Sequence, residues 1–291
     1  MLNDLLFWLF FELFCRQIHW ILPNILSWGM NSSVWSSLKG KHVVVTGATG
    51  ELGRELVKIL SEKDVKLILV DTNEHKLTSL QEKLKLKNVI SFIHSVNFNS
   101  ENDFSFLDIY ENIGLLINNT DFYKNPSLYL EEDDDNLISV NIRSTTRITR
   151  RVLEKMIERK FGFILNLGSF VSEMPFPYNA SYAGSKAFLK SWSHSLHYEM
   201  KRFNIEVEYV ESTSSLLGSK KVLANGILNG FGSTKHLVSC FPLFVMKCLL
   251  VFCPDFVLGR AVEWFHRKFH LEKRLEERNK RKMVALKKVN L

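Results

Sequence analysis

The sequence predicts a doubly wound parallel α/β fold, a three-layer α/β/α sandwich. Short runs rich in Val, Ile and Leu alternate with amphipathic helical stretches, which is the pattern of strands joined by helical crossovers. Few charges interrupt these runs, as expected of strands that helices cover on both faces. A glycine-rich turn, TGATGELG at 46–53, lies between the first run and the first helical stretch. Together these three observations favour one α/β domain.

The expected strands and helices follow one another in order. Strands are expected at 42–46, 65–70, 88–96, 114–119, 162–169 and 205–210, with a last edge strand at 235–241. Amphipathic helices are expected at 53–63, 142–159 and 182–203. Beyond about Thr213 the pattern weakens to a loop and a short helix.

The net charge of +7 is confined to one end of the 291-residue chain. Residues 259–291 hold 11 Lys and Arg against 4 Asp and Glu, which accounts for the whole excess. A basic tail beside apolar sequence fits an anionic membrane surface better than a nucleic acid. We therefore expect a membrane partner and no nucleic acid.

Apolar segments flank the predicted domain on both sides. Residues 1–38 begin with an almost unbroken apolar run at 5–14 and are interpreted as a hydrophobic membrane anchor and linker. The acidic start at Asp4 argues against a cleavable signal peptide. Residues 39–241 form the predicted domain, and 242–291 form an apolar segment followed by a basic amphipathic tail. The alternative for each apolar segment is packing on the protein's own core.

The glycine turn indicates a site for a dinucleotide. Gly47, Gly50 and Gly53 are three residues apart, and Leu52 lies among them. In a Rossmann-like turn such glycines let the backbone approach a pyrophosphate at a helix N-terminus. Asp71 ends the second expected strand, where a carboxylate accepts hydrogen bonds from the adenosine ribose. A carboxylate there repels a 2′-phosphate, which favours NAD over NADP; the alternative for Asp71 is a helix N-cap.

A second group of residues is suited to proton transfer. Tyr182 and Lys186 are four apart on an expected helix and therefore share a face. A free tyrosine has a pKa of about 10, and a fixed ammonium nearby is expected to lower the pKa of Tyr182. Ser169 ends a strand 13 residues before Tyr182 and can hydrogen-bond a substrate oxygen. The amide of Asn141 can hold a water that extends a proton relay from the lysine.

The chain resembles the short-chain dehydrogenase/reductase family over residues 40 to about 240. The motifs that carry the resemblance occur in family order and spacing: the glycine turn, LLINN at 115–119, ISVN at 138–141, LNLGS at 165–169 and YAGSK at 182–186. VDTNEHKL at 70–77 and the apolar ends are similar to one group within the family. That group contains the membrane-associated 17-beta-hydroxysteroid dehydrogenases type 11 and 13 and the retinol dehydrogenases.

The resemblance implies a role for each matched residue. Tyr182 is implied as the general acid/base, and Lys186 as the group that lowers its pKa and binds the nicotinamide ribose. Ser169 is implied to orient the substrate, and Asn141 to hold the relay water. The remaining residues of the implied cofactor site are Gly47, Gly50, Leu52 and Gly53 at the pyrophosphate, Asp71 at the ribose, Asn97 at the adenine, and Asn118.

Four positions depart from the family pattern. Glu51 stands where a glycine is usual and places a carboxylate near the pyrophosphate. Thr120-Asp121 replaces the usual Ala-Gly and adds bulk and charge beside the cofactor channel. Asn97 stands in place of an acid, and Glu211-Ser212 replaces the usual Pro-Gly beside the nicotinamide. These departures motivate an alternative, a catalytically weak or inactive homologue that acts as a membrane or lipid-droplet protein.

The resemblance predicts an NAD(P)-dependent oxidoreductase that interconverts a lipophilic alcohol and a ketone or aldehyde. Steroid, retinoid and long-chain lipid substrates are all compatible with it. The implied location is the endoplasmic reticulum membrane or a lipid droplet, with the catalytic domain facing the cytosol, and a homodimer is implied by analogy. No metal site is expected, because His194 and His197 have no third ligand nearby in sequence. Apolar side chains of 213–232 are expected to line the substrate mouth: Leu216, Leu217, Val222, Leu223, Ile227, Leu228 and Phe231.

Overall fold

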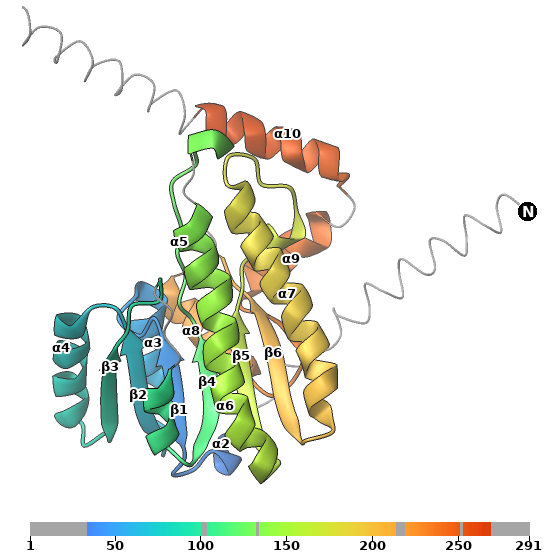
Figure 1. Cartoon of the computed structure of the whole chain (residues 1–291). Helices are drawn as coiled ribbons and strands as arrows, with labels where there is room; N and C mark the ends of the chain where they lie inside the picture. Colours follow the sequence, from blue (N-terminus) through green and yellow to red (C-terminus); the bar gives the residue numbers. More distant parts are fainter. Residues whose placement is uncertain (1–33, 100–103, 132–133, 214–218, 251–252, 269–291) are drawn as a thin grey trace, which may run out of the picture.

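A single parallel sheet of seven strands organises the molecule (Figure 1). The structure, a computed structural model, describes residues 34–99, 104–131, 134–213, 219–250 and 253–268. The strand order is β3-β2-β1-β4-β5-β6-β7, and every neighbouring pair is parallel. The strands are β1 (His42–Thr46), β2 (Lys66–Asp71), β3 (Ser91–Ser95), β4 (Ile113–Asn118), β5 (Gly162–Leu167), β6 (Ile205–Glu211) and β7 (His236–Val238).

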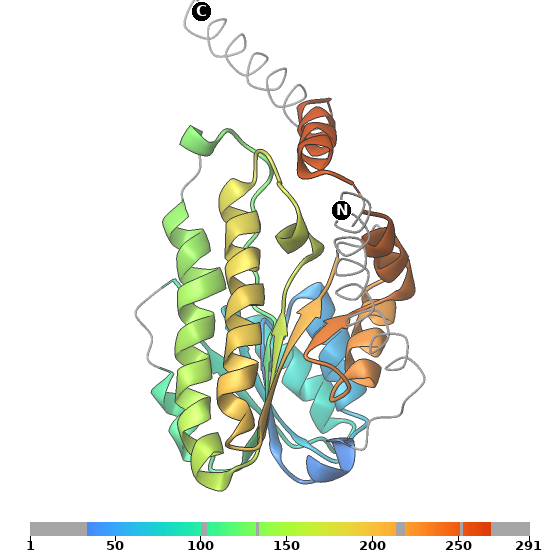
Figure 2. The same cartoon turned by 90° about the vertical axis from the view of Figure 1, so that its right-hand side faces the viewer.

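Helices cover both faces of this sheet, which gives the three layers that the sequence predicts (Figure 2). One face carries α3 (Glu51–Leu60), α4 (Glu74–Lys85) and α8 (Lys220–Gly230), and the other carries α6 (Thr145–Arg159) and α7 (Ala180–Lys201). The remaining elements are α2 (Val34–Ser37), η1 (Ser105–Ile109), η2 (Tyr129–Glu131), α5 (Asp134–Ile138), the π-helical turn η3 (Ser139–Ser144), η4 (Phe170–Glu173), α9 (Phe241–Leu250) and α10 (Asp255–His266).

The central strands are buried on both faces because their side chains alternate between two apolar cores. Val43 and Val45 of β1 join the core beneath α3 and α8, whereas Val44 joins the core beneath α6 and α7. All three side chains are fully buried. This alternation explains why the strand sequences are continuous apolar runs, and it confirms the predicted Rossmann-like fold class.

Two segments near the predicted domain boundaries pack on the domain itself. The expected linker contains α2, whose Trp35 ring lies 5.4 Å from the ring of Phe231, and the following Leu38 is fully buried. Leu243 and Phe244 of α9 are buried in a third apolar core with Val238 of β7. For the described part of 242–258, packing on the protein's own core therefore describes α9 better than immersion in a membrane.

Most of the predicted anchor and basic tail lies outside the described residues. The apolar run at 5–14 and the basic stretch 269–291 are both in this category. Among the residues that the structure describes, no helix is long and apolar enough to cross a bilayer.

Candidate active site

A large cleft opens at the carboxyl edge of the sheet, where ligands bind in open α/β folds. Its volume is about 1290 Å³, above the roughly 300–1,000 Å³ of ordinary small-molecule sites. The ends of β1, β2, β4 and β5 contribute to the lining, together with α7 and α10. Of the expected site residues, these line the cleft: Gly47, Gly50, Leu52, Gly53, Asp71, Asn97, Ser169, Tyr182 and Lys186.

The glycine turn is closed so tightly that side chains are excluded from it. Gly47 has φ +62°, a backbone conformation that L side chains rarely adopt. A Cβ atom on Gly53 would lie 2.1 Å from the carbonyl oxygen of Gly47. The turn leads into α3, whose N-cap residue Gly50 supplies no side-chain hydrogen bond. The first amides of α3 are therefore placed to bind an anion in the cleft.

Asp71 and Asn97 form the adenosine end of the cleft. Asp71 Oδ2 accepts hydrogen bonds from the backbone N–H and the hydroxyl of Thr49, each at 2.8 Å. Asp71 Oδ1 accepts from the backbone N–H of Thr72 at 2.7 Å. These bonds fix the carboxylate beside the glycine turn while it still lines the cleft. Asn97 also lines the cleft, and its Oδ1 accepts from the N–H of Asn99 at 3.0 Å.

The structure places Asn118 behind the cleft and Asn119 in it. The Asn118 amide donates to Thr149 Oγ1 at 2.9 Å and to Asn166 Oδ1 at 2.7 Å, and the residue is not part of the cleft lining. Asn119 lines the cleft, and its amide donates to the carbonyl oxygen of Gly47 at 2.9 Å. Successive side chains along a strand point to opposite faces of the sheet. This alternation in the sequence is the signal that could have indicated Asn119 in place of Asn118.

Tyr182 and Lys186 lie on one face of α7 and are buried against the cleft. The two residues are 7% and 3% exposed, and the Lys186 ammonium lies 5.5 Å from the centre of the Tyr182 ring. Ser169 follows β5 as the N-cap of η4, where its hydroxyl accepts from the N–H of Val171 at 3.4 Å. A hydrogen bond with Ser169 also acts to lower the pKa of Tyr182. The expected serine, tyrosine and lysine are therefore brought together.

The loop after β4 adds a carboxylate to this group. Asp121 Oδ2 accepts a hydrogen bond from the Tyr182 hydroxyl at 2.9 Å, and Asp121 Oδ1 lies 2.9 Å from Lys186 Nζ. Burial, followed by the charge and hydrogen bond of Asp121, holds the pKa of Tyr182 well above its usual value. The prediction that this pKa is lowered is therefore wrong, because the phenol is desolvated and Asp121 opposes the ammonium.

Asn141 lies inside the π-helical turn η3 that links α5 to α6, in contact with Ser185 of α7. Its Oδ1 accepts from the N–H of Phe122 at 2.7 Å, and its Nδ2 donates to the carbonyl oxygen of Phe122 and to Ser185 Oγ. π-helical turns often occur at functional sites. These bonds hold the backbone of Phe122, next to Asp121, and the relay water at Asn141 stays a prediction.

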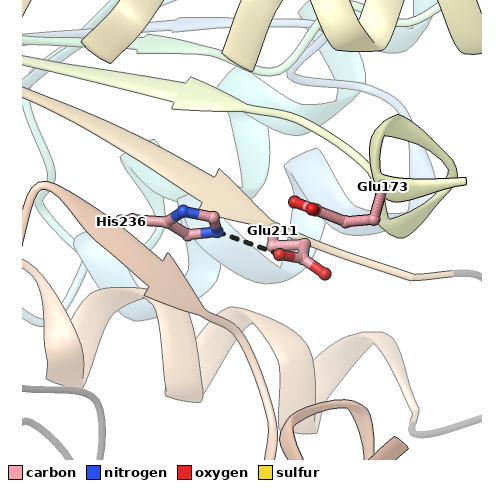
Figure 3. Close-up of side chains that lie close together, drawn as sticks. All are labelled: Glu173, Glu211 and His236. Carbon is pink, nitrogen blue, oxygen red and sulfur yellow. Dashed lines mark hydrogen bonds and ion pairs between the residues drawn. The ribbon is translucent and has the colours of Figure 1, made fainter. Parts of the chain in front are cut away.

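A buried polar cluster, formed by Glu173, Glu211, His236 and Lys247, lies behind the cleft and was not predicted. One potential ligand atom from each of the two carboxylates and the imidazole lies within 4.8 Å of the others (Figure 3). Lys247 Nζ forms ion pairs with Glu211 Oε2 and, at 3.1 Å, with Glu173 Oε1. Burial above all, and the charge of Lys247, hold the pKa of His236 well below its usual value. The ammonium thus supplies the positive charge that balances this cluster.

The apolar side of the cleft is lined by segments other than the one that the sequence predicted. Leu223 and Ile227 of α8, and Phe231 directly after it, are fully buried in the domain cores, so the prediction that they line a substrate mouth is wrong. Leu216 and Leu217 lie outside the described residues. Much of the apolar lining comes from the segment after β5 and from α10: Phe170, Val171, Met174, Phe176, Ala261, Val262 and Phe265.

The cleft fits a nicotinamide dinucleotide. The closed glycine turn and the uncapped start of α3 offer backbone amides to phosphates, and Asp71 offers a carboxylate to a ribose. Thr120 Oγ1 is buried at the cleft and has no hydrogen-bond partner among the described residues. Two carboxylates oppose the fit, Glu51 at the start of α3 and Asp121 beside Lys186. The residues present are therefore consistent with a dinucleotide, although the charge at the nicotinamide end is unusual.

Sequence comparison agrees with this geometry. Residues 41–215 match the family model described as short chain dehydrogenase. This match spans more than half of the chain, and the protein therefore belongs to the short-chain dehydrogenase family.

The most similar relatives include two fungal proteins named very-long-chain 3-oxoacyl-CoA reductase. The protein of Pyricularia oryzae is 33% identical over 220 residues, which cover 70% of this chain and 65% of the relative. That of Aspergillus terreus is 30% identical over 261 residues, covering 80% and 74%. The chain thus spans less than two thirds of the first of these relatives. Neither name is that of the hydroxysteroid or retinol dehydrogenase group that the sequence resembles.

Solved structures show the same fold at low sequence identity. A bulky-bulky ketone specific alcohol dehydrogenase from Comamonas testosteroni has a TM-score of 0.65 at 20% identity, covering 69% of this chain and 87% of that protein. A 7beta-hydroxysteroid dehydrogenase has a TM-score of 0.72 at 13% identity, covering 80% and 100%. Other neighbours were solved with NAD+ or with NADPH. Membership of the short-chain dehydrogenase family supports an NAD(P)-dependent oxidoreductase acting on CH–OH groups.

Proposed function

We propose that this protein interconverts a lipophilic alcohol and the corresponding ketone or aldehyde with a nicotinamide dinucleotide. The observation that carries the proposal is that Ser169, Tyr182 and Lys186 share one cleft with the glycine turn and Asp71. A bound dinucleotide would supply hydride transfer to or from the substrate carbon. The glycine turn would hold its pyrophosphate, Asp71 one ribose and Lys186 the other.

The chain's own part in the reaction is proton transfer and substrate positioning. Tyr182 Oη carries the proton that the substrate oxygen gains or loses, and Ser169 Oγ hydrogen-bonds that oxygen. Asn141 acts on this group by holding the backbone of Phe122, next to Asp121. The apolar side of the cleft excludes water from the reacting atoms and suits a hydrocarbon chain.

We favour a long-chain 3-oxoacyl thioester as the class of substrate. The relatives' name supports it, and so do Met174, Phe176, Val262 and Phe265 in the cleft lining. Steroid and retinoid alcohols remain candidates, because the same apolar surface suits them. A screen of full-length protein in detergent with these three classes would decide among them by the ratio of kcat/KM values.

We infer a preference for NAD over NADP. The supporting observation is that Asp71 is fixed by Thr49 and Thr72 at the adenosine end, where a 2′-phosphate would meet its charge. Tighter binding of NADH than NADPH in a fluorescence titration is expected. Equal or tighter binding of NADPH would reject the preference.

The matched pair Gly53→Ala and Gly184→Ala tests the dinucleotide site. A Cβ on Gly53 meets backbone at 2.1 Å, whereas a Cβ on Gly184, which is exposed on α7, meets nothing within 4 Å. NADH is expected to bind the wild type and Gly184→Ala, and to bind Gly53→Ala at least about tenfold more weakly. Absence of NADH and NADPH binding to the folded wild-type protein would refute the proposed function.

We propose that residues 1–38 anchor the protein to the endoplasmic reticulum membrane or to lipid droplets, with the domain in the cytosol. The support is the apolar sequence at 5–14 and, on α10, the exposed side chains of Phe256 and Trp264. Removal of residues 1–30 should move the protein from the membrane fraction to the supernatant. Undiminished pelleting after that deletion would contradict the anchor.

We also propose, on the family resemblance, a homodimer that pairs α6 and α7 with their copies. The exposed Phe188 and Tyr198 on α7 support an interface there. Light scattering should give twice the monomer mass, and Tyr198→Glu should reduce it. A monomer at micromolar concentration would contradict the dimer.

A second candidate, a weakly active or inactive homologue at a membrane or lipid droplet, is favoured by one observation. Asp121 engages both Tyr182 and Lys186, the groups that a substrate and a dinucleotide would need. On this alternative, NADH binding is absent or turnover with all three substrate classes equals that of Tyr182→Phe. Saturable binding with Tyr182-dependent turnover would exclude it.

A further inference from the structure

We propose, resting on the oxidoreductase function above, that Asp121 is a further residue of the catalytic site, whose carboxylate keeps the Tyr182 phenol protonated at neutral pH. The resting site then favours the phenol, which donates a proton to a carbonyl, over the phenolate, which takes a proton from an alcohol. The residue lies at a position where the family usually has glycine.

One carboxylate bridges both catalytic groups. Asp121 Oδ2 accepts from Tyr182 Oη at 2.9 Å, while Oδ1 pairs with Lys186 Nζ, also at 2.9 Å. Asp121 comes from the loop after β4 and the other two from α7, so tertiary structure alone creates the contact. The Asp121 side chain is 39% exposed toward the cleft, whereas that of Lys186 is 3% exposed. All three residues line the cleft, so the carboxylate lies where a substrate and a dinucleotide would meet the buried pair.

This arrangement reverses the usual electrostatic effect of the lysine. An ammonium alone would favour the phenolate, but an equal negative charge in direct contact with both groups cancels that effect. The other polar groups that face Tyr182 among the described residues are Ser169 and Tyr123, whose ring centre lies 5.0 Å away. Ser169 lowers the pKa of Tyr182, whereas burial, Asp121 and Tyr123 raise it. The balance favours the neutral phenol.

The chemical consequence concerns the protonation state that each direction of the reaction needs. In reduction, the carbonyl carbon accepts a hydride from the reduced dinucleotide and the carbonyl oxygen takes the proton from Tyr182 Oη. The products are the alcohol, the oxidised dinucleotide and a phenolate, which regains a proton from water. The phenol proton reaches the substrate by rotating away from Asp121 about the Cζ–Oη bond. Oxidation starts from the phenolate, which becomes about tenfold rarer for each unit by which the pKa rises.

The first test titrates Tyr182 in the protein without dinucleotide. Phenolate absorbance in the near ultraviolet is followed against pH, and the signal of Tyr182→Phe is subtracted to isolate this residue. In Asp121→Asn, which keeps the shape and removes the charge, the titration of Tyr182 is expected at least about one pH unit lower. Asp121→Gly, which restores the residue usual in the family, should shift it in the same direction.

The matched control is Glu51→Gln, because Glu51 is an exposed carboxylate that lines the same cleft. This variant removes the same charge from the cleft and should leave the titration of Tyr182 in place. An unchanged titration in both Asp121 variants would overturn the proposal. An equal shift in Glu51→Gln would also overturn it, because the effect would then come from net charge.

The second test uses the pH dependence of kcat/KM in both directions. Oxidation should increase with pH and reduction should decrease with pH around the same midpoint, which Asp121→Asn should move to lower pH by about one unit or more. A midpoint that stays in place would contradict the role of Asp121. If the wild type binds no dinucleotide, the proposed function fails, but the titration of the ligand-free protein still decides the role of Asp121.

Discussion

Asp121 and Glu211 are two carboxylates at the carboxyl edge of one sheet, in places where the family usually has uncharged residues. Glu211 is fully buried, and its cation is Lys247 from α9. Asp121 is 39% exposed in the cleft, and its cation is Lys186, the proposed partner of Tyr182 in proton transfer. The same change in charge thus lies in a fully buried ion pair at one place and, under the proposed function, at the reacting groups in the other. The two sites differ in how deeply the carboxylate is buried and in which lysine forms an ion pair with it.

The largest effect on stability is expected for Lys247→Met. Removing the ammonium leaves the buried carboxylate of Glu211 beside the imidazole of His236, at 2.9 Å, and burial disfavours a positive charge on that imidazole. The free energy of unfolding should therefore decrease by about 3–5 kcal/mol. Urea denaturation of the full chain measures this loss. The double variant Lys247→Met, Glu211→Gln should recover most of it, because no buried charge remains. If Lys247→Met lowers the free energy of unfolding by less than about 1 kcal/mol, the buried Glu211–Lys247 pair does not distinguish the two regions.

The next effect is a loss of stability in acid that belongs to the region behind the cleft. Burial, with the positive charges of Lys190, Lys235 and Lys247, lowers the pKa of His194 from 6.5 to about 4. The unfolded chain therefore binds a proton between these values that the folded protein does not. Stability is full above pH 6.5 and falls as the pH decreases toward 4, by roughly 2 kcal/mol from this residue. A flatter pH dependence in His194→Gln, measured by urea denaturation, is expected; an unchanged slope would contradict it.

The smallest effect is expected for Asp121→Asn. An ion pair with a partly exposed partner contributes about 0–1 kcal/mol, so the free energy of unfolding should change by less than about 1 kcal/mol. The same denaturation series measures it beside Lys247→Met. A loss as large as that of Lys247→Met would mean that Asp121 is structural, and the contrast between the two carboxylates would disappear.

The sequence was sufficient for the features that local spacing determines. The apolar runs located the strands along the chain, and the positions of the glycine turn, Asp71, Ser169 and the Tyr182–Lys186 pair follow from strand ends and from one helical turn. Asn97 was selected through the family resemblance, and it also lines the cleft. The family match of residues 41–215 agrees with the range that these motifs indicated.

What the sequence could not supply were contacts between distant segments. The sheet brings Asp121 to Tyr182 and Lys186. Burial first, and then Asp121, raises the pKa of Tyr182, where the sequence predicted a lowered value. Glu211 and Lys247 meet only because α9 packs beside β7. The sequence selected Asn118 as a cofactor residue, but Asn119 lines the cleft. The choice between them depends on the direction in which each side chain points at the end of β4. The contribution of α10 to the apolar lining could be recognised only from the path of the chain after β7.

The proposed function depends most directly on Tyr182 as the proton carrier beside a bound dinucleotide. Turnover of a long-chain 3-oxoacyl thioester with NADH, measured on full-length wild type and Tyr182→Phe, is the decisive comparison. Loss of the hydroxyl should lower kcat by at least about 100-fold and leave the Kd for NADH unchanged. A Tyr182→Phe variant that binds NADH and reduces the substrate at the wild-type rate would contradict the account.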